Sequence, residues 1–234
     1  MKSLVLMFFM ICICSQYASI ADVEEQLNQI NIHEYVDEPL FISLGSWCNI
    51  ALNLRTNGMR KAAFPFDWIT SVDCEKFLEI LITDFKYFLD DEYLFFKDNH
   101  FFNNYYKLEF LHELPRDRGL NPATTEEWAA FKEKYIRRIN RFKELENYKG
   151  KVYFLRSSFG YSNHPQRRFK CAENVSISDT YACALYNTLK KRFPRLDFTL
   201  IICDIGKEEK KLSESLIRLQ SVPDLNKINK IFFP

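Results

Sequence analysis

The chain is poor in glycine and proline, with 6 and 8 among its 234 residues, so it is neither collagen-like nor a low-complexity disordered chain. It also lacks an excess of one charge: 32 basic side chains balance 31 acidic ones, which gives no reason to expect binding to nucleic acid or to a membrane surface. Aromatic residues, in contrast, are plentiful, with 22 Phe and 12 Tyr. Length and composition together predict one globular domain with a sizeable core.

Long apolar runs are absent except near the amino terminus. Lys2 is followed by an apolar segment over residues 4–14, and then by a polar stretch with small residues at Ser19 and Ala21. A positive start, a short apolar segment and small residues before a cut are typical of a secretory signal peptide, and the run is shorter than the roughly 20 residues of a membrane-spanning helix. We therefore expect residues 1–21 to be cleaved, the protein to be secreted or exported, and no integral membrane span to remain.

The sequence also lacks the cysteine and histidine spacings of metal sites. Its four histidines are scattered and no CxxC pair occurs, so neither a metal nor another cofactor is expected. Five cysteines remain after signal cleavage, and they lie at Cys48, Cys74, Cys171, Cys183 and Cys203. In an oxidising compartment an odd count indicates one unpaired thiol or an intermolecular bridge, whereas five buried and inert thiols are the alternative.

Apolar periodicity divides the remaining chain into alternating strands and helices. Residues 22–38 are polar and are expected to form a short helix or an arm packed on the domain. The patterns predict strands at 41–44, 105–111, 152–155, 198–203 and 231–233, and helices at 49–57, 74–89, 179–192 and from Thr124 or Thr125 onward. This alternation predicts an α/β fold: a single three-layer domain over residues 39–234 with a mostly parallel central sheet.

The long helix that begins near Thr124 carries a cluster of arginines. Its apolar positions predict a buried stripe, and Arg137, Arg138 and Arg141 are expected to lie off that stripe. Such a charge run is usually a solvated face or a set of ion pairs, so we do not interpret it as a phosphate site.

Chemically active side chains follow the predicted strands. In open α/β sheets, sites form beyond the carboxyl ends of the strands, where the loops converge. The residues at these ends are Gly45, Ser46, Trp47 and Cys48 after the first strand, His112 after the second, Arg156 and Ser157 after the third, and Asp204 after the fourth.

Cys48 is the predicted nucleophile among these residues. It falls in the first turn of a predicted helix, where the helix dipole lowers a thiol pKa below its usual value of about 8.5 and free N–H groups can receive an oxyanion. Gly45 allows the tight turn that precedes it. The alternative is that Cys48 simply packs under Trp47.

Partners for a Cys48 thiolate are also present in the sequence. His112 is the natural general base because imidazole titrates near neutrality, and Asp67 or Asp204 is the expected orienting acid. Arg156 is expected to bind a substrate carboxylate or to pair with a structural acid.

A resemblance supports this interpretation. The segment SLGSWCNIALNLRTNGMRKAAFPFDWITS (43–71) resembles the signature of an uncharacterised papain-like cysteine peptidase family, a Leu-Gly-x-x-Cys turn followed by a Pro-Phe-Asp-Trp block. Weaker similarities follow at FLHE (110–113), YIRRINRF (135–142) and VYFLRSS (152–158). The resemblance implies that Cys48 is the nucleophile and His112 its base, although Glu113 stands where the family has Asp. It also implies a papain-like α+β fold, which is the alternative to the parallel α/β fold.

The sequence thus predicts an exported cysteine-dependent hydrolase that cleaves a peptide, or another amide or ester, through an acyl-enzyme. One alternative is an SGNH-like esterase in which Ser46 attacks, because the Gly-Ser turn after a first strand is similar to the nucleophile turn of that class. The other is a secreted binding or effector protein without chemistry, with the aromatic residues of segment 93–106 as its contact surface. The sequence leaves the oligomeric state open.

Overall fold

The structure is a computed structural model, and it describes residues 26–27, 29–114, 121–158, 177–204, 207–220 and 230. The predicted signal peptide (1–21), the predicted strand at 231–233, and Cys171 lie outside the described residues. No helix within the described ranges is long and apolar enough to cross a membrane.

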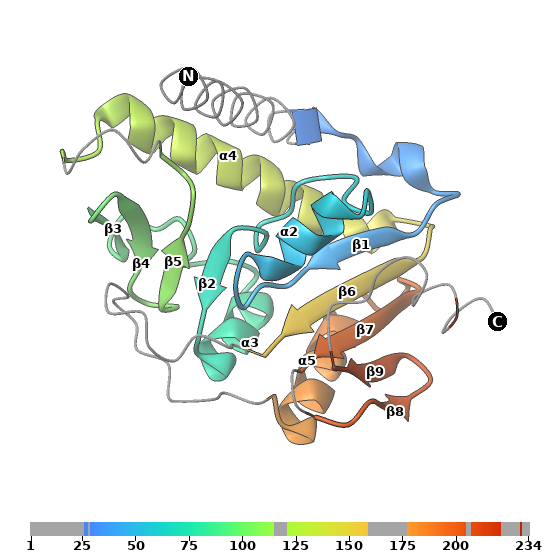
Figure 1. The fold of residues 1–234 in the computed structure, drawn as a ribbon. Coiled ribbons are helices and arrows are strands. Elements are labelled where there is room, and N and C mark those ends of the chain that lie inside the picture. Colours follow the sequence, from blue (N-terminus) through green and yellow to red (C-terminus); the bar gives the residue numbers. More distant parts are fainter. Residues whose placement is uncertain are drawn as a thin grey trace, which may run out of the picture.

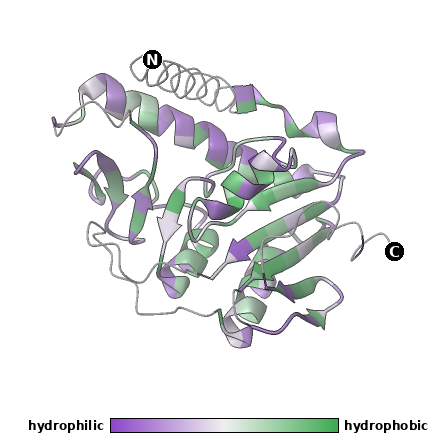
Figure 2. Cartoon of the chain, viewed as in Figure 1, coloured by the Kyte–Doolittle hydropathy of each residue, from purple (hydrophilic) through white to green (hydrophobic). Residues whose placement is uncertain are grey.

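A five-stranded sheet, sheet A, forms the centre of the fold (Figure 1). Its order is β1-β6-β7-β9-β8, and every neighbouring pair is parallel except β8 with β9. The strands are β1 (Leu40–Ser43), β6 (Val152–Ser157), β7 (Phe198–Cys203), β9 (Leu216–Leu219) and β8 (Lys210–Ser213). Figure 2 shows β1, β6 and β7 mostly in hydrophobic colours, as expected for parallel strands buried on both faces.

Helices cover both faces of sheet A. Side chains of α2 (Asn49–Thr56) pack on one face with Phe41, Tyr153 and Ile201. The alternate strand residues, such as Ile42 and Phe154, join the main core on the other face, to which α3 (Cys74–Ile82), α4 (Thr125–Glu144) and α5 (Asp179–Arg192) contribute. The predicted α/β class with a mostly parallel central sheet is confirmed.

A second, antiparallel sheet was not predicted. Sheet B has the order β2-β5-β4-β3, with β2 (Ile69–Ser71), β5 (Leu108–Phe110), β4 (His100–Asn103) and β3 (Leu94–Lys97). Asp98 and Asn99 connect β3 to β4 with φ angles of 50° and 62°, the left-handed conformation of a two-residue hairpin turn. The predicted strand over 105–111 shortens to β5, because residues 104–107 form a turn.

The aromatic segment 93–106 belongs mainly to this sheet and to the core. Phe101, Phe102 and Tyr106 are buried, and the Phe101 ring stacks 4.2 Å from the ring of Phe131 on α4. The half-buried Phe95 stacks on Phe102 with 5.1 Å between the ring centroids, a distance typical of aromatic pairs. Most aromatic side chains of this segment therefore pack within the domain.

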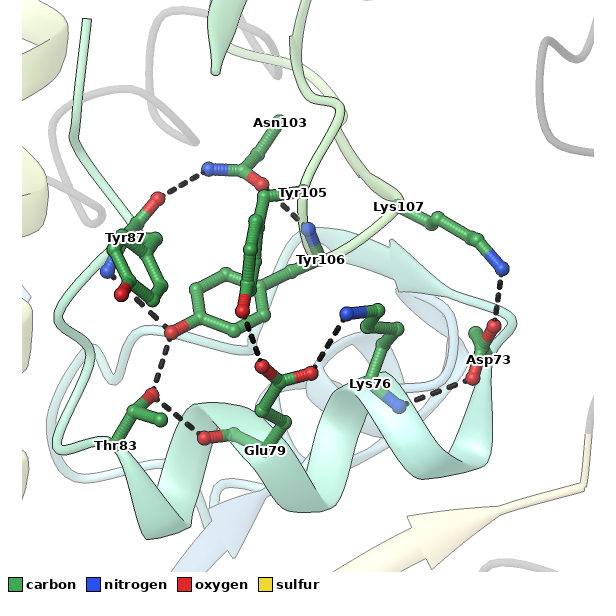
Figure 3. A network of polar contacts seen from close by, with 9 residues as sticks. All are labelled: Asp73, Lys76, Glu79, Thr83, Tyr87, Asn103, Tyr105, Tyr106 and Lys107. Atoms are coloured by element: carbon green, nitrogen blue, oxygen red, sulfur yellow. Dashed lines mark hydrogen bonds and ion pairs between the residues drawn. The ribbon is translucent and has the colours of Figure 1, made fainter. Parts of the chain in front are cut away.

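Helix α3 ends at Ile82, although the periodicity predicts a helix to residue 89. Asp84 and Phe85 have φ angles of 52° and 64°, so the backbone leaves the helix there. Polar contacts then join this corner to the turn of sheet B: Thr83 and Tyr106 share a 2.6 Å hydrogen bond (Figure 3). The Tyr105 hydroxyl donates to Glu79 at 2.5 Å, which raises the pKa of Tyr105 to about 12. A tertiary network thus stabilises a corner that apolar spacing alone does not reveal.

Helix α4 begins as predicted, because Thr124 forms a capping box with Glu127. The expectation that all three arginines lie off the buried stripe is wrong, since Arg138 and Arg141 are buried. Arg141 donates to the backbone carbonyls of Ile30 (3.0 Å) and Ala63 (2.6 Å). Backbone acceptors therefore compensate for the desolvation of a side chain that sequence patterning places in solvent.

Candidate active site

The turn after β1 is built on Gly45, whose φ is +73°. A Cβ at this position would lie 3.2 Å from Ser71 Oγ and 3.4 Å from Arg156 Nη1, so both the conformation and the available space favour glycine. Ser71 belongs to β2 and Arg156 to β6. The predicted tight turn is therefore present, and the two sheets meet at it.

Hydrogen bonds hold the polypeptide backbone of this turn on both sides. Ser43 Oγ accepts from the Gly45 N–H at 3.1 Å, and the Ser157 N–H donates to the Gly45 carbonyl at 3.3 Å. The Ser71 N–H donates to the Ser46 carbonyl at 3.0 Å. Sheet A and sheet B thus fix the segment that leads directly into α2.

Cys48 is the N-cap residue of α2 and is half-buried. Its carbonyl accepts the first helical hydrogen bond, from the Leu52 N–H at 2.9 Å, and its own side chain makes no capping hydrogen bond to the helix. The first-turn N–H groups of a helix have no partner within the helix, so they are available to an oxyanion next to the thiol. Ser157 lies close by, because its hydroxyl donates to Asn49 Oδ1 at 3.3 Å.

The residues between Gly45 and Cys48 differ in their access to solvent. Ser46 is 3% exposed, and its Oγ is buried without a hydrogen-bond partner among the described residues. Trp47 is half-buried. An attacking group must reach a substrate, so the half-buried thiol of Cys48 is better placed for this role than the Ser46 hydroxyl.

Arg156 lies beneath the turn and is 1% exposed. Its Nη1 donates to the Leu44 carbonyl (2.6 Å) and to Ser71 Oγ (2.7 Å), and its Nη2 donates to the Ser71 carbonyl (3.0 Å). The guanidinium also lies 3.9 Å from the ring centroid of Phe77. No carboxylate of the described residues pairs with it, so the predicted pairing with a structural acid is not found there.

His112 follows β5, has a φ of +59° and is exposed. Its ring lies edge-on to Trp68 with 5.8 Å between centroids. The Leu111 N–H donates to the Trp68 carbonyl at 2.8 Å, which places His112 beside the residue that precedes β2. The Cys48 turn meets β2 at Ser71, roughly 10 Å further along the strand at 3.4 Å per residue. The pairing of His112 with Cys48 stays a prediction.

The two proposed orienting acids both have buried arginine partners. Asp67 accepts from Arg60 Nη2 at 2.7 Å and from the Phe64 N–H at 2.8 Å, and burial raises its pKa against the opposing effect of Arg60. Asp204 accepts from Arg218 Nη1 at 2.5 Å. Because these contacts explain both carboxylates structurally, an orienting role for either one needs direct testing.

Sequence reasoning missed a histidine–carboxylate pair. His100 Nδ1 and Glu109 Oε1 lie 2.8 Å apart on neighbouring strands of sheet B, and the carboxylate is buried. Alternation places residues 100, 102 and 109 on one face of the sheet, but only the register of β4 with β5 brings them together. Glu113, in contrast, accepts from Lys134 (2.7 Å) and Tyr135 (2.8 Å), which points to a structural role.

The cysteines and acidic residues of the described ranges form neither a disulfide nor a metal cluster. Cys48, Cys74, Cys183 and Cys203 are not in disulfides with one another. No group of three or more His, Cys, Asp or Glu side chains in the described part of the chain could hold a metal ion.

The fold and the position of Cys48 define a class, an α/β domain that presents a thiol at the amino end of the helix after its first strand. The chain belongs to the family described as "putative papain-like cysteine peptidase", whose profile matches residues 39–206. It is also 29% identical over 143 aligned positions to an uncharacterised protein of Acanthamoeba polyphaga mimivirus, and the alignment covers 53% of this chain and 63% of that protein. No solved structure shows significant similarity.

Proposed function

We propose that this protein is an exported cysteine-dependent hydrolase whose Cys48 thiolate attacks an amide or ester carbonyl. The observation that carries this proposal is the position of Cys48, half-buried at the amino end of α2, after a turn fixed by both sheets. Membership of a cysteine peptidase family supports a peptide as the substrate.

The reaction has two stages. The Cys48 sulfur forms a bond to the carbonyl carbon, the carbonyl oxygen becomes an oxyanion near the first-turn N–H groups of α2, and the amine or alcohol leaves with a proton from the acid/base. Water then hydrolyses the thioester, which regenerates the thiol and releases the acid. We assign the acid/base role to His112, as the sequence and the family resemblance suggest.

Alkylation of the folded protein at different pH values, measured for each cysteine by mass spectrometry, tests the nucleophile. Exposed Cys183 is the reference thiol, and Cys74 is a matched control because it is half-buried and begins α3. Burial raises the pKa of the Cys74 thiol against the opposing effect of Arg156. We expect the midpoint of Cys48 to lie about one pH unit or more below that of Cys183. A midpoint equal to or above that of Cys183 would contradict an activated thiol.

The base can be identified with the same readout. His112→Asn is expected to raise the midpoint of Cys48, whereas His100→Asn, which disrupts the pair with Glu109, serves as the matched control. If only His100→Asn raises the midpoint, the base is His100 and the assignment of His112 is wrong.

Measurements of substrate turnover distinguish the two candidate nucleophiles, Cys48 and Ser46. On a peptide or thioester substrate turned over by the protein, Cys48→Ala is expected to abolish turnover and Ser46→Ala to leave most of it. The reverse result would favour the SGNH-like esterase, and turnover unaffected by either substitution would refute both nucleophiles.

Export is part of the proposal and rests on the amino-terminal sequence alone. Expression of the full chain in a secreting host should yield extracellular protein that begins at Asp22. Retention of residues 1–21 on a protein that stays inside the cell would contradict cleavage and export.

A further inference from the structure

Arg156 has a different environment from the one expected of a substrate-binding arginine. It is 1% exposed, and its terminal nitrogens donate to two residues, Leu44 and Ser71, while its charge also acts on the Cys74 thiol and the Tyr181 hydroxyl. A guanidinium that binds a substrate carboxylate has to present N–H groups to the ligand. In Arg156 both terminal nitrogens already donate to groups of the protein.

These contacts lie on either side of the turn that leads to Cys48. Leu44 immediately precedes Gly45, and the Ser71 N–H donates to the Ser46 carbonyl. One guanidinium therefore joins the end of β1 to the end of β2. The backbone of β2 then holds the Gly45–Ser46 turn through the Ser46 carbonyl. The close approach of Nη1 to the Gly45 position, 3.4 Å from an ideal Cβ, shows how tightly the turn lies over this side chain.

The charge of Arg156 is not balanced by an acid among the described residues. A buried charge without a counter-ion is costly, and polar acceptors together with the Phe77 ring at 3.9 Å offset only part of that cost. The geometry of its fork, which binds three acceptors at once, therefore explains why an arginine suits this position. A lysine, as a single point charge, cannot reproduce that geometry.

From these contacts we infer that Arg156 is a positioning residue for Cys48. It fixes the Leu44 carbonyl and the end of β2, and thereby the Gly45–Ser46 turn and the first turn of α2. This inference rests on the proposed function for its chemical consequence, the alignment of the thiol with the helix N–H groups. Its structural part, the rigidity of the turn, can be measured without any activity.

The test compares Arg156→Met with Arg141→Met by hydrogen–deuterium exchange of peptides covering residues 44–52. Arg141 is a matched control because it is also buried and also donates to two backbone carbonyls, but it contacts Ile30 and Ala63 instead. We expect Arg156→Met to accelerate exchange in this segment about tenfold, relative to the rest of the domain, because buried hydrogen bonds are lost. Arg141→Met should leave the relative rate unchanged, and Arg156→Lys should give an intermediate value.

Equal exchange of residues 44–52 in the wild type and Arg156→Met, or equal acceleration in both methionine variants, would overturn the inference. Should Arg156→Met not fold, Ser71→Ala removes a single acceptor and keeps the arginine, and about threefold faster exchange of the same segment is expected. Unchanged exchange in that variant counts against the inference as well.

Alkylation of Cys48 connects the two proposals and keeps them distinguishable. If the wild-type midpoint is low and Arg156→Met raises it, Arg156 positions an activated thiol. An ordinary wild-type midpoint would refute the proposed function, while the exchange result would still decide whether Arg156 fixes the turn.

Discussion

Arg156 and Arg218 lie in the same row of sheet A, with Ile202 between them, and yet the protein stabilises the two charges differently. Arg156 pairs with Ile202 in register across β6 and β7, and Ile202 pairs with Arg218 across β7 and β9. Arg218 donates to Asp204 (2.5 Å) and to Asp179 (2.8 Å). Arg156 contacts carbonyls, a hydroxyl and a ring.

The difference separates two functions of buried arginine. At the β7–β9 side, two carboxylates neutralise the charge of Arg218, and its contact with Asp179 joins the sheet to the amino end of α5. At the β1–β6 side, neutral acceptors hold the guanidinium next to the turn that leads to Cys48. The first arrangement is explained by stability, whereas the second leaves a positive charge without a carboxylate partner among the described residues, beside the turn that precedes Cys48.

The largest expected effect on the free energy of unfolding comes from breaking the ion pair between Arg218 and Asp204. Asp204→Asn leaves Arg218 buried with a weaker partner, and removal of one member of a buried pair costs about 3–5 kcal/mol. Because Arg218 keeps Asp179 and the Ile177 carbonyl, we expect a loss of about 3 kcal/mol in urea unfolding. A loss below about 1 kcal/mol would show that the pair is not the source of stability.

Gly45→Ala is the next largest perturbation, and it acts at the turn beside Arg156. The positive φ disfavours a Cβ, and the added atom meets Ser71 Oγ at 3.2 Å. We expect a loss of about 2 kcal/mol, together with slower alkylation of Cys48. Gly58→Ala is the control, since Gly58 also has a positive φ but no atom within 4 Å of its Cβ position. Equal effects of the two substitutions on Cys48 would contradict the link between the Gly45 turn and the thiol.

A smaller effect is expected from the ring beneath Arg156. Phe77→Leu and Arg156→Met, made singly and together, form a double-mutant cycle for the contact of 3.9 Å. We expect a coupling free energy of about 1 kcal/mol in urea unfolding. A coupling near zero would mean that the ring does not compensate for the missing counter-ion.

The smallest effect is a difference in pH dependence. Hydrogen bonds from Lys210 and then Arg218 lower the pKa of Asp179 below its ordinary value. A lowered folded-state pKa contributes stability above the unfolded pKa of about 3.9, and this contribution is lost as the pH falls through the folded-state value. Asp179→Asn should therefore flatten the acid limb of the stability curve, whereas Arg156→Met should leave its slope unchanged. Urea unfolding between neutral and acidic pH measures both slopes.

Several elements of this protein follow from local sequence. Continuous apolar runs mark β6 and β7, because strands buried on both faces need apolar side chains at every position. Thr124 and Ser178 begin α4 and α5, since their hydroxyls accept from the backbone N–H groups of the first helical turn.

Tertiary structure decided the partners of the side chains. The arginines on α4 look solvated by periodicity, but Arg141 reaches carbonyls from segments 78 and 111 residues away in the sequence. The second sheet and its His100–Glu109 pair depend on the register between short strands, which composition does not fix. Likewise, the sequence predicts that Arg156 binds a substrate carboxylate or pairs with a structural acid, and only the meeting of β1 and β2 shows that both of its terminal nitrogens donate to the protein itself. Local propensity is encoded within a few residues, whereas burial and pairing of charges depend on groups that only the folded chain brings together.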